Sequence, residues 1–174
     1  AFDMKRRGKQ NKNSVVGTIL TNLGFFKFCE ANDNRFEATK VGGRYVLDEM
    51  RLDNYYFGGE QSGHIIFHDF STTGDGQMTA AHLFSLLKRR EAKMSSLASV
   101  MERYPQTMVN IKVSPEGKVA FYTDQKVREA IRSAEERIGN DGRVIVRPSG
   151  TEPLLRVMVE GPDEETIDEI AQQV

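Results

Sequence analysis

The sequence of 174 residues contains one cysteine, three histidines and five prolines. The single cysteine, Cys29, excludes an internal disulfide and fits a reducing compartment, so we expect a cytoplasmic protein. No signal peptide is visible, and no apolar run approaches the roughly 20 residues that a membrane-spanning helix needs. Neither sign of charge dominates: 24 Lys and Arg face 25 Asp and Glu. This balance argues against a nucleic-acid or membrane partner and leaves room for one local basic pocket.

The scarce residue types are unevenly distributed along the chain. All five prolines follow residue 104, whereas all three histidines and nine of the ten phenylalanines precede it. This shift predicts two domains, residues 1–104 and 105–174, that meet near Pro105. The chain begins with Ala1 instead of Met, which suggests a processed chain or a piece of a longer one. The basic residues between positions 5 and 12 are expected to form a solvated helix face or a tail.

The first domain alternates strand and helix patterns. Strands are predicted at residues 14–20, 35–38 and 64–68, and helices at 23–29, 45–50 and 80–87, the last with Asp75 near its start. This alternation predicts a three-layer α/β domain with a mixed, largely parallel sheet. A connecting helix is expected to carry Leu97, Val100, Met101 and Tyr104 on one face, with Ser95 or Ser96 as its cap, and to end at Pro105.

The second domain has a different order of elements. Strands are predicted at residues 108–113, 143–146 and 154–159, helices at 127–138 and 167–174, and extra strands within 118–123. The order β-α-β-β-α predicts a small α+β domain, an antiparallel sheet with two helices on one face. An RNA-binding sheet shares this order, but these strands lack the paired aromatic residues that stack on bases.

The composition of a glycine-rich segment, residues 58–64 (GGEQSGH), suggests a ligand-binding site. Three glycines within six residues are unsuited to a strand interior or a helix, and they permit tight turns and close approach of a ligand. Between and after them stand Glu60, Gln61, Ser62 and His64. Such mixed donors and acceptors suit a hydroxyl-rich ligand such as a sugar. The alternative is a polar turn that leads into the strand at His64.

A second segment, residues 147–153 (RPSGTEP), lies between two predicted strands and is followed by Arg156. An arginine, two hydroxyls and a glycine N–H form an anion cradle, in which Arg147, Ser149 and Thr151 would contact a phosphate. Neither a Walker A loop nor a G-x-S-x-G nucleophile elbow is present. The alternative is a β-turn with a surface arginine. Taken together, the two segments would suit a phosphorylated sugar held where the two domains meet.

Both segments resemble motifs of the α-D-phosphohexomutase family. Residues 59–64 look like its sugar-binding loop and residues 147–153 like its phosphate-binding loop, and residues 39–46 and 73–76 follow the family's order. Gly43 departs from the pattern, which favours an acidic residue there. With Gln61, the loop resembles that of the amino-sugar branch of the family, because the glucose and mannose branches commonly carry Met at this position.

The resemblance implies an enzyme of four domains around a cleft. A phosphoserine in the first domain and an Asp-Gly-Asp-Gly-Asp loop for Mg²⁺ in the second carry the chemistry, and this sequence contains neither loop. The chain therefore resembles domain three, clipped at its start, and domain four, with the N-terminal domains as missing partners. The implied reaction interconverts glucosamine 6-phosphate and glucosamine 1-phosphate through glucosamine 1,6-bisphosphate. The fragment alone is expected to be inactive, and an oligomer is left open.

The resemblance also implies residue roles. Arg147, Ser149, Gly150 and Thr151, with Arg156 as a weaker member, would anchor the phosphate that is not reacting. Glu60 and Ser62, with Gln61, would bind the sugar hydroxyls. His64 would contact the phosphate, assist proton transfer or only support the loop. No metal ligand is expected in this chain. The alternatives are a freestanding sugar-phosphate-binding module and a mutase of the glucose or mannose branch.

Overall fold

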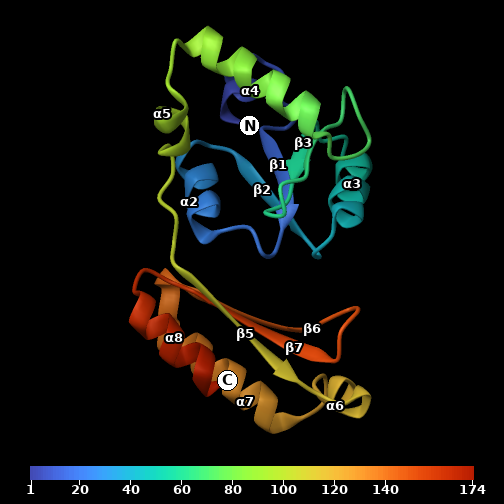
Figure 1. Ribbon diagram of the computed structural model, residues 1–174, viewed down its shortest axis with the longest axis vertical. Helices are drawn as coiled ribbons and strands as arrows, with labels where there is room; N and C mark the ends of the chain where they lie inside the picture. The colour runs from blue at the N-terminus through green and yellow to red at the C-terminus, as the bar shows by residue number, and fades with distance from the viewer. The chain divides into compact units, whose positions relative to one another are not determined.

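The computed structural model describes all residues from 1 to 174 (Figure 1). The chain divides into a first unit, Ala1–Arg103, and a second unit, Tyr104–Val174. Each unit has its own sheet and its own hydrophobic core. No helix of either unit combines the length and the apolar character that crossing a lipid bilayer requires.

The first unit contains a four-stranded mixed sheet with the order β2-β1-β3-β4. Its strands are β1 (Ser14–Thr18), β2 (Arg35–Thr39), β3 (Phe57–Gly59) and β4 (Ile65–Phe67). The central strand β1 pairs in parallel with β2 and β3, whereas β4 is antiparallel to β3. Every residue of β1 is buried, as expected of a β-branched strand covered on both faces. The predicted mixed sheet is confirmed.

Helices cover both faces of this sheet and make the predicted three layers. On one face, Val46 and Met50 of α3 (Gly43–Leu52) pack into a core with Val16 of β1. The other face contacts α2 (Leu23–Ala31) and α4 (Gly76–Arg90). There Phe25 of α2 lies edge-on to Phe36 of β2, with ring centroids 5.7 Å apart. The ring of His82 of α4 stacks on that of Phe67 of β4, with centroids 4.1 Å apart, so His82 packs against the sheet.

Gly58 lies inside β3, which contradicts the expectation that the glycines of this segment are unsuited to a strand interior. Gly58 and Gly59 both pair with β4, and Gly58 also pairs with β1. A Cβ on Gly58 would lie 2.6 Å from Met50 Sδ, and one on Gly59 would lie 2.6 Å from the His64 carbonyl oxygen. The strand carries glycine because α3 and the neighbouring strand approach it too closely for a side chain.

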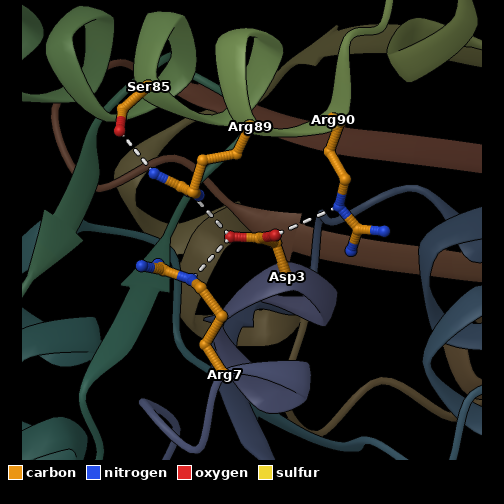
Figure 2. A network of polar contacts seen from close by, with 5 residues as sticks. All are labelled: Asp3, Arg7, Ser85, Arg89 and Arg90. Carbon is orange, nitrogen blue, oxygen red and sulfur yellow. Dashed lines mark hydrogen bonds and ion pairs between the residues drawn. The ribbon is translucent and has the colours of Figure 1, made fainter.

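Of the basic residues between positions 5 and 12, only Lys5 and Arg6 lie in a helix, α1 (Phe2–Arg6), and the others lie in the turns that follow it. Asp3 of α1 accepts contacts from Arg7 and from Arg89 and Arg90 at the end of α4, as Figure 2 shows. Lys5 donates to the carbonyl oxygens of residues 32 and 33, just after α2. These contacts join α1 to α2 and α4. The start of α4 is capped as predicted, since Asp75 accepts from the Met78 N–H at 2.9 Å.

The predicted connecting helix at residues 97–104 is wrong. The structure has only a short helix, α5 (Met94–Ala98), which follows Lys93 without a side-chain cap. Beyond it, the Glu102 carbonyl oxygen lies so close to α2 that a Cβ on Gly24 would meet it at 1.7 Å. We infer that this contact holds the chain out of a helix, because a short isolated helix is marginal without tertiary support.

The second unit is a three-stranded antiparallel sheet with the order β5-β7-β6. Its strands are β5 (Gln106–Lys112), β6 (Arg143–Pro148) and β7 (Leu154–Glu160). Two helices, α7 (Gln125–Ile138) and α8 (Glu164–Gln173), bury their apolar stripes in a core with the sheet. A 3-10 turn, η1 (Gly139–Asp141), follows α7. The predicted α+β arrangement is confirmed.

The extra strands predicted within residues 118–123 are wrong, because this region begins in α6 (Pro115–Ala120) and continues in turns. The sequence carries the signal for this helix. Ser114 accepts from the Gly117 N–H at 3.1 Å, and Pro115 occupies the first turn, where its missing N–H costs no hydrogen bond. Helix α6 places Lys118 beside residues 147–153.

Candidate functional site

The glycine loop (residues 58–64) runs from β3 into β4 as a tight hairpin. The Glu60 N–H donates to the His64 carbonyl at 2.9 Å, and the Gly63 N–H donates to the Glu60 carbonyl at 3.0 Å. Gly63 has a φ of +95°, which favours glycine there. These two backbone hydrogen bonds close the turn between β3 and β4.

The hairpin exposes the polar side chains that the sequence singled out. Gln61, Ser62 and His64 are exposed, and Glu60 is half-buried at the base of the loop. Ser62 Oγ lies 3.0 Å from His64 Nδ1, at hydrogen-bonding distance. The structure therefore couples Ser62 to His64, a contact that the separate roles expected of them did not include.

Two further motifs converge on this hairpin. A Cβ on Gly74 would lie 3.0 Å from the His64 Cβ, so the segment before α4 packs directly against His64. A Cβ on Gly43, at the start of α3, would lie 3.7 Å from Glu60 Oε1. An acidic residue at position 43 would therefore have placed a second carboxylate beside that of Glu60. Glycine at this position leaves Glu60 without that repulsion.

A cavity of about 480 Å³ lies next to the hairpin, within the first unit. Glu60 and Gln61 contribute to its wall, but Phe25, Phe36 and Phe57 supply much of its apolar lining. A hydroxyl-rich ligand needs more polar partners than this lining offers. The exposed side of the hairpin is accordingly the better candidate for sugar hydroxyls.

The anion loop (residues 147–153) joins β6 to β7 in the second unit. The Ser149 N–H donates to the Leu154 carbonyl at 2.8 Å, and the Glu152 N–H donates to Ser149 Oγ at 3.2 Å. Ser149 is 5% exposed, so this hydroxyl is mainly a structural acceptor whose own proton remains available. Gly150 and Thr151 are exposed at the tip of the loop.

Arg147 and Arg156 lie opposite each other in the β6–β7 ladder. Burial and the neighbouring Arg156 charge both lower the pKa of the Arg147 guanidinium. Arg156 pairs with Glu152, yet its Nε–H is buried without an acceptor. Arg147 makes no ion pair with any carboxylate of the chain. A half-buried pair of cations with too few acceptors is an environment that favours an anion.

The sequence analysis did not identify Lys118, which lies on α6 and contacts the anion loop. Its Nζ donates to the Ser149 carbonyl oxygen at 2.6 Å. The pattern that could have located it is Ser114-Pro115, the start of a helix that ends beside the loop. The structure thus adds a third cation to Arg147 and Arg156.

No group of three or more His, Cys, Asp or Glu side chains in the chain gathers in a way that could hold a metal ion. Among the acidic residues near the hairpin, Asp75 caps α4 with its carboxylate. The donor set for Mg²⁺, several oxygen ligands around one point, is therefore not assembled by these residues.

Comparison with protein families assigns both units. Residues 1–104 match the family model described as "Phosphoglucomutase/phosphomannomutase, alpha/beta/alpha domain III". Residues 108–174 match the model described as "Phosphoglucomutase/phosphomannomutase, C-terminal domain". The two matches lie in the order of the two units and cover almost the whole chain.

Curated relatives include bacterial phosphoglucosamine mutases. That of Levilactobacillus brevis is 51% identical over 164 residues, which are 94% of this chain and 36% of the relative. That of Caldanaerobacter subterraneus subsp. tengcongensis is 48% identical over 174 residues, which are 100% of this chain and 39% of the relative. The chain thus spans less than two fifths of the length of these relatives.

Solved structures of lower identity share the fold. An Aspergillus fumigatus N-acetylphosphoglucosamine mutase superposes with a TM-score of 0.83 at 19% identity. The superposition covers 99% of this chain and 40% of that enzyme's chain. Another structure of this enzyme, in complex with GlcNAc-6P and magnesium, gives a TM-score of 0.78 at 16% identity, over 99% of this chain and 43% of its own.

Proposed function

Because the chain belongs to the phosphoglucomutase/phosphomannomutase family and comprises its domain III and its C-terminal domain, we propose that it is the phosphosugar-binding part of a phosphoglucosamine mutase. The whole enzyme would interconvert glucosamine 6-phosphate and glucosamine 1-phosphate through glucosamine 1,6-bisphosphate. The amino-sugar preference is supported by relatives of that name at 46–51% identity and by Gln61 in the glycine loop.

The observation that carries this proposal is the unpaired, half-buried Arg147 beside Arg156. A phosphate oxygen would supply the acceptors that the anion loop lacks. Arg147, the Gly150 N–H and the hydroxyls of Ser149 and Thr151 would bind it, with Arg156 contributing through its orphaned Nε–H. Binding the phosphate that does not react fixes the substrate, and phosphoryl transfer depends mainly on such positioning.

The glycine loop would bind the sugar itself. Glu60 would accept hydrogen bonds from hydroxyl groups, and Ser62 and Gln61 would donate or accept them. For His64 we propose a role in the loop's polar face, because Ser62 Oγ is already within hydrogen-bonding distance of its Nδ1. Its Nε2 remains the atom that could exchange a proton with a substrate oxygen.

The phosphoserine and Mg²⁺ of this chemistry would belong to the part of the enzyme outside this chain. Bound Mg²⁺ would neutralise charge on the transferring phosphoryl group. The residues present here do not assemble a site for it. The upstream domains are then the required partner. The single cysteine, buried and free, agrees with the cytoplasm as the proposed compartment.

The proposal is tested by assaying the chain 1–174 beside the full-length product of its coding region, with glucosamine 6-phosphate and glucosamine 1,6-bisphosphate. We expect turnover from the full-length protein and none from residues 1–174. Sustained turnover by residues 1–174 alone would contradict the partial-enzyme account. Phosphosugar binding without turnover in the full-length protein would instead favour a freestanding binding module.

A further inference from the structure

We propose that Lys118 is a positioning residue of the anion loop, which holds the Ser149–Gly150 peptide so that the Gly150 N–H faces a bound phosphate. The inference rests on the proposed function and deepens it, since it names the residue that prepares one donor of the phosphate site. Lys118 lies on α6, outside both segments that the sequence singled out.

Lys118 contacts the peptide group that joins Ser149 to Gly150. Lys118 Nζ donates to the Ser149 carbonyl oxygen at 2.6 Å, across 31 residues of sequence. The chain contains no cis peptide bond, so the Ser149 C=O and the Gly150 N–H point in opposite directions. Drawing the carbonyl toward α6 therefore turns the Gly150 N–H away from α6, on the other side of the loop.

The backbone N–H of Ser149 and its hydroxyl oxygen are both engaged in hydrogen bonds within the loop. Its N–H donates to the Leu154 carbonyl, and its Oγ accepts from the Glu152 N–H. These bonds fix Ser149 on the strand side of the loop. The Ser149–Gly150 peptide could still rotate, and the hydrogen bond from Lys118 to its carbonyl oxygen restrains that rotation.

The space around Gly150 is open. A Cβ at Gly150 would meet nothing within 4 Å, and its φ lies outside the positive region. Neither packing nor backbone strain therefore requires glycine at this position. Close approach of a ligand to the N–H gives a reason for glycine at an exposed loop tip.

The charge of Lys118 also favours a bound anion. It forms no salt bridge, and its side chain is half-buried against the loop. An ammonium on the carbonyl end of a peptide polarises that peptide and strengthens its N–H as a donor. The same charge adds to those of Arg147 and Arg156. The orientation of the Gly150 N–H, its polarisation and the charge of Lys118 thus all favour binding of a phosphate.

The test compares Lys118→Met with Lys118→Arg, and uses Lys126→Met on the exposed start of α7 as the matched control. Inorganic phosphate and glucosamine 6-phosphate are titrated into each chain 1–174, with amide NMR as the readout. We expect Lys118→Met to weaken both ligands about tenfold and Lys118→Arg to restore most of that loss. Lys126→Met should change the affinity by less than about twofold.

Two readouts separate positioning from charge and from misfolding. The ratio of affinities between the wild-type chain and Lys118→Met should persist in about 1 M salt, where the Debye length is only about 3 Å. The Gly150 amide shift of Lys118→Met should move without ligand, while amides of the β7 core stay in place. An unchanged Gly150 amide, or a loss that vanishes in high salt, would overturn the positioning role. If no chain binds phosphate, the proposed function fails, and the ligand-free Gly150 amide still decides the role of Lys118.

Discussion

Two arginines four positions apart on β6 differ in what surrounds them. Arg143 donates from Nε to Glu160 at 2.7 Å, and Glu160 is fully buried. Arg147 has no such carboxylate, and its pKa is lowered by burial and by Arg156. Arg143 therefore compensates a charge within the fold, whereas Arg147 is available to compensate a charge that arrives from outside.

The two arginine-to-alanine variants should accordingly separate stability from binding. Arg143→Ala removes the guanidinium from the fully buried Glu160 carboxylate, and we expect it to lower the free energy of unfolding by about 3–5 kcal/mol. Arg147→Ala should change that free energy by less than about 1 kcal/mol. It should also weaken phosphosugar binding by roughly 1.5–3 kcal/mol. Urea unfolding and calorimetric titration measure the two effects, and equal destabilisation by both variants would contradict this division.

Cys29 gives a prediction that depends on pH. Its side chain is 1% exposed, and burial raises the pKa of the thiol from 9.0 to about 11. The folded state thus holds the thiol proton more tightly than the unfolded state does. The resulting stabilisation is complete below pH 9 and is lost as the pH rises toward about 11. Unfolding midpoints of the wild type and Cys29→Ala should converge over this interval, and a constant difference would refute the burial of the thiol.

At the scale of elements, the sequence predicted long periodic segments better than short contacts. The stripes of α7 and α8 and the β-branched β1 formed as predicted, because their burial follows from their own pattern. Strand β3 was not predicted, because its glycines are required by close contacts with Met50 and His64, which the local sequence does not show. The expected helix at 97–104 failed for the same reason, because the contact between Glu102 and Gly24 is invisible in local sequence.

The site was predictable to a similar extent. The two loops were located by their composition, but Lys118 and the contact of Gly74 with His64 depend on how distant segments fold. The buried position of Ser149 was not predictable either, because it follows from the hydrogen bond between the Glu152 N–H and Ser149 Oγ.

Two glycines make this distinction testable. A Cβ on Gly58 would lie 2.6 Å from Met50 Sδ and 3.0 Å from Val46 Cγ1, so Gly58→Ala should cost about 1–3 kcal/mol of stability by overpacking. Gly150→Ala meets open space and should leave the thermal midpoint nearly unchanged while it weakens phosphate binding. Thermal melts with and without phosphate report both effects. A destabilised Gly150→Ala would show that this glycine serves the fold instead.

At the scale of the whole molecule, the two units have separate cores and carry different loops. A ligand that binds only the anion loop should therefore stabilise the second unit. At one hundred times its Kd, inorganic phosphate should add about 2.7 kcal/mol, which slows globally exchanging amides of that unit up to about 100-fold. Hydrogen exchange measures this, and equal protection of residues 1–103 would contradict a site confined to the anion loop.

The central claim, that the glycine loop and the anion loop recognise the sugar and the phosphate of one ligand class, is tested most directly by amide NMR of the chain 1–174. Three titrants, inorganic phosphate, glucosamine and glucosamine 6-phosphate, are added to the same sample. We predict that phosphate shifts the amides of residues 149–151 alone, and that glucosamine 6-phosphate shifts these together with residues 60–64. Glucosamine 6-phosphate that shifts neither loop, or that binds equally well to Arg147→Ala, would contradict the account.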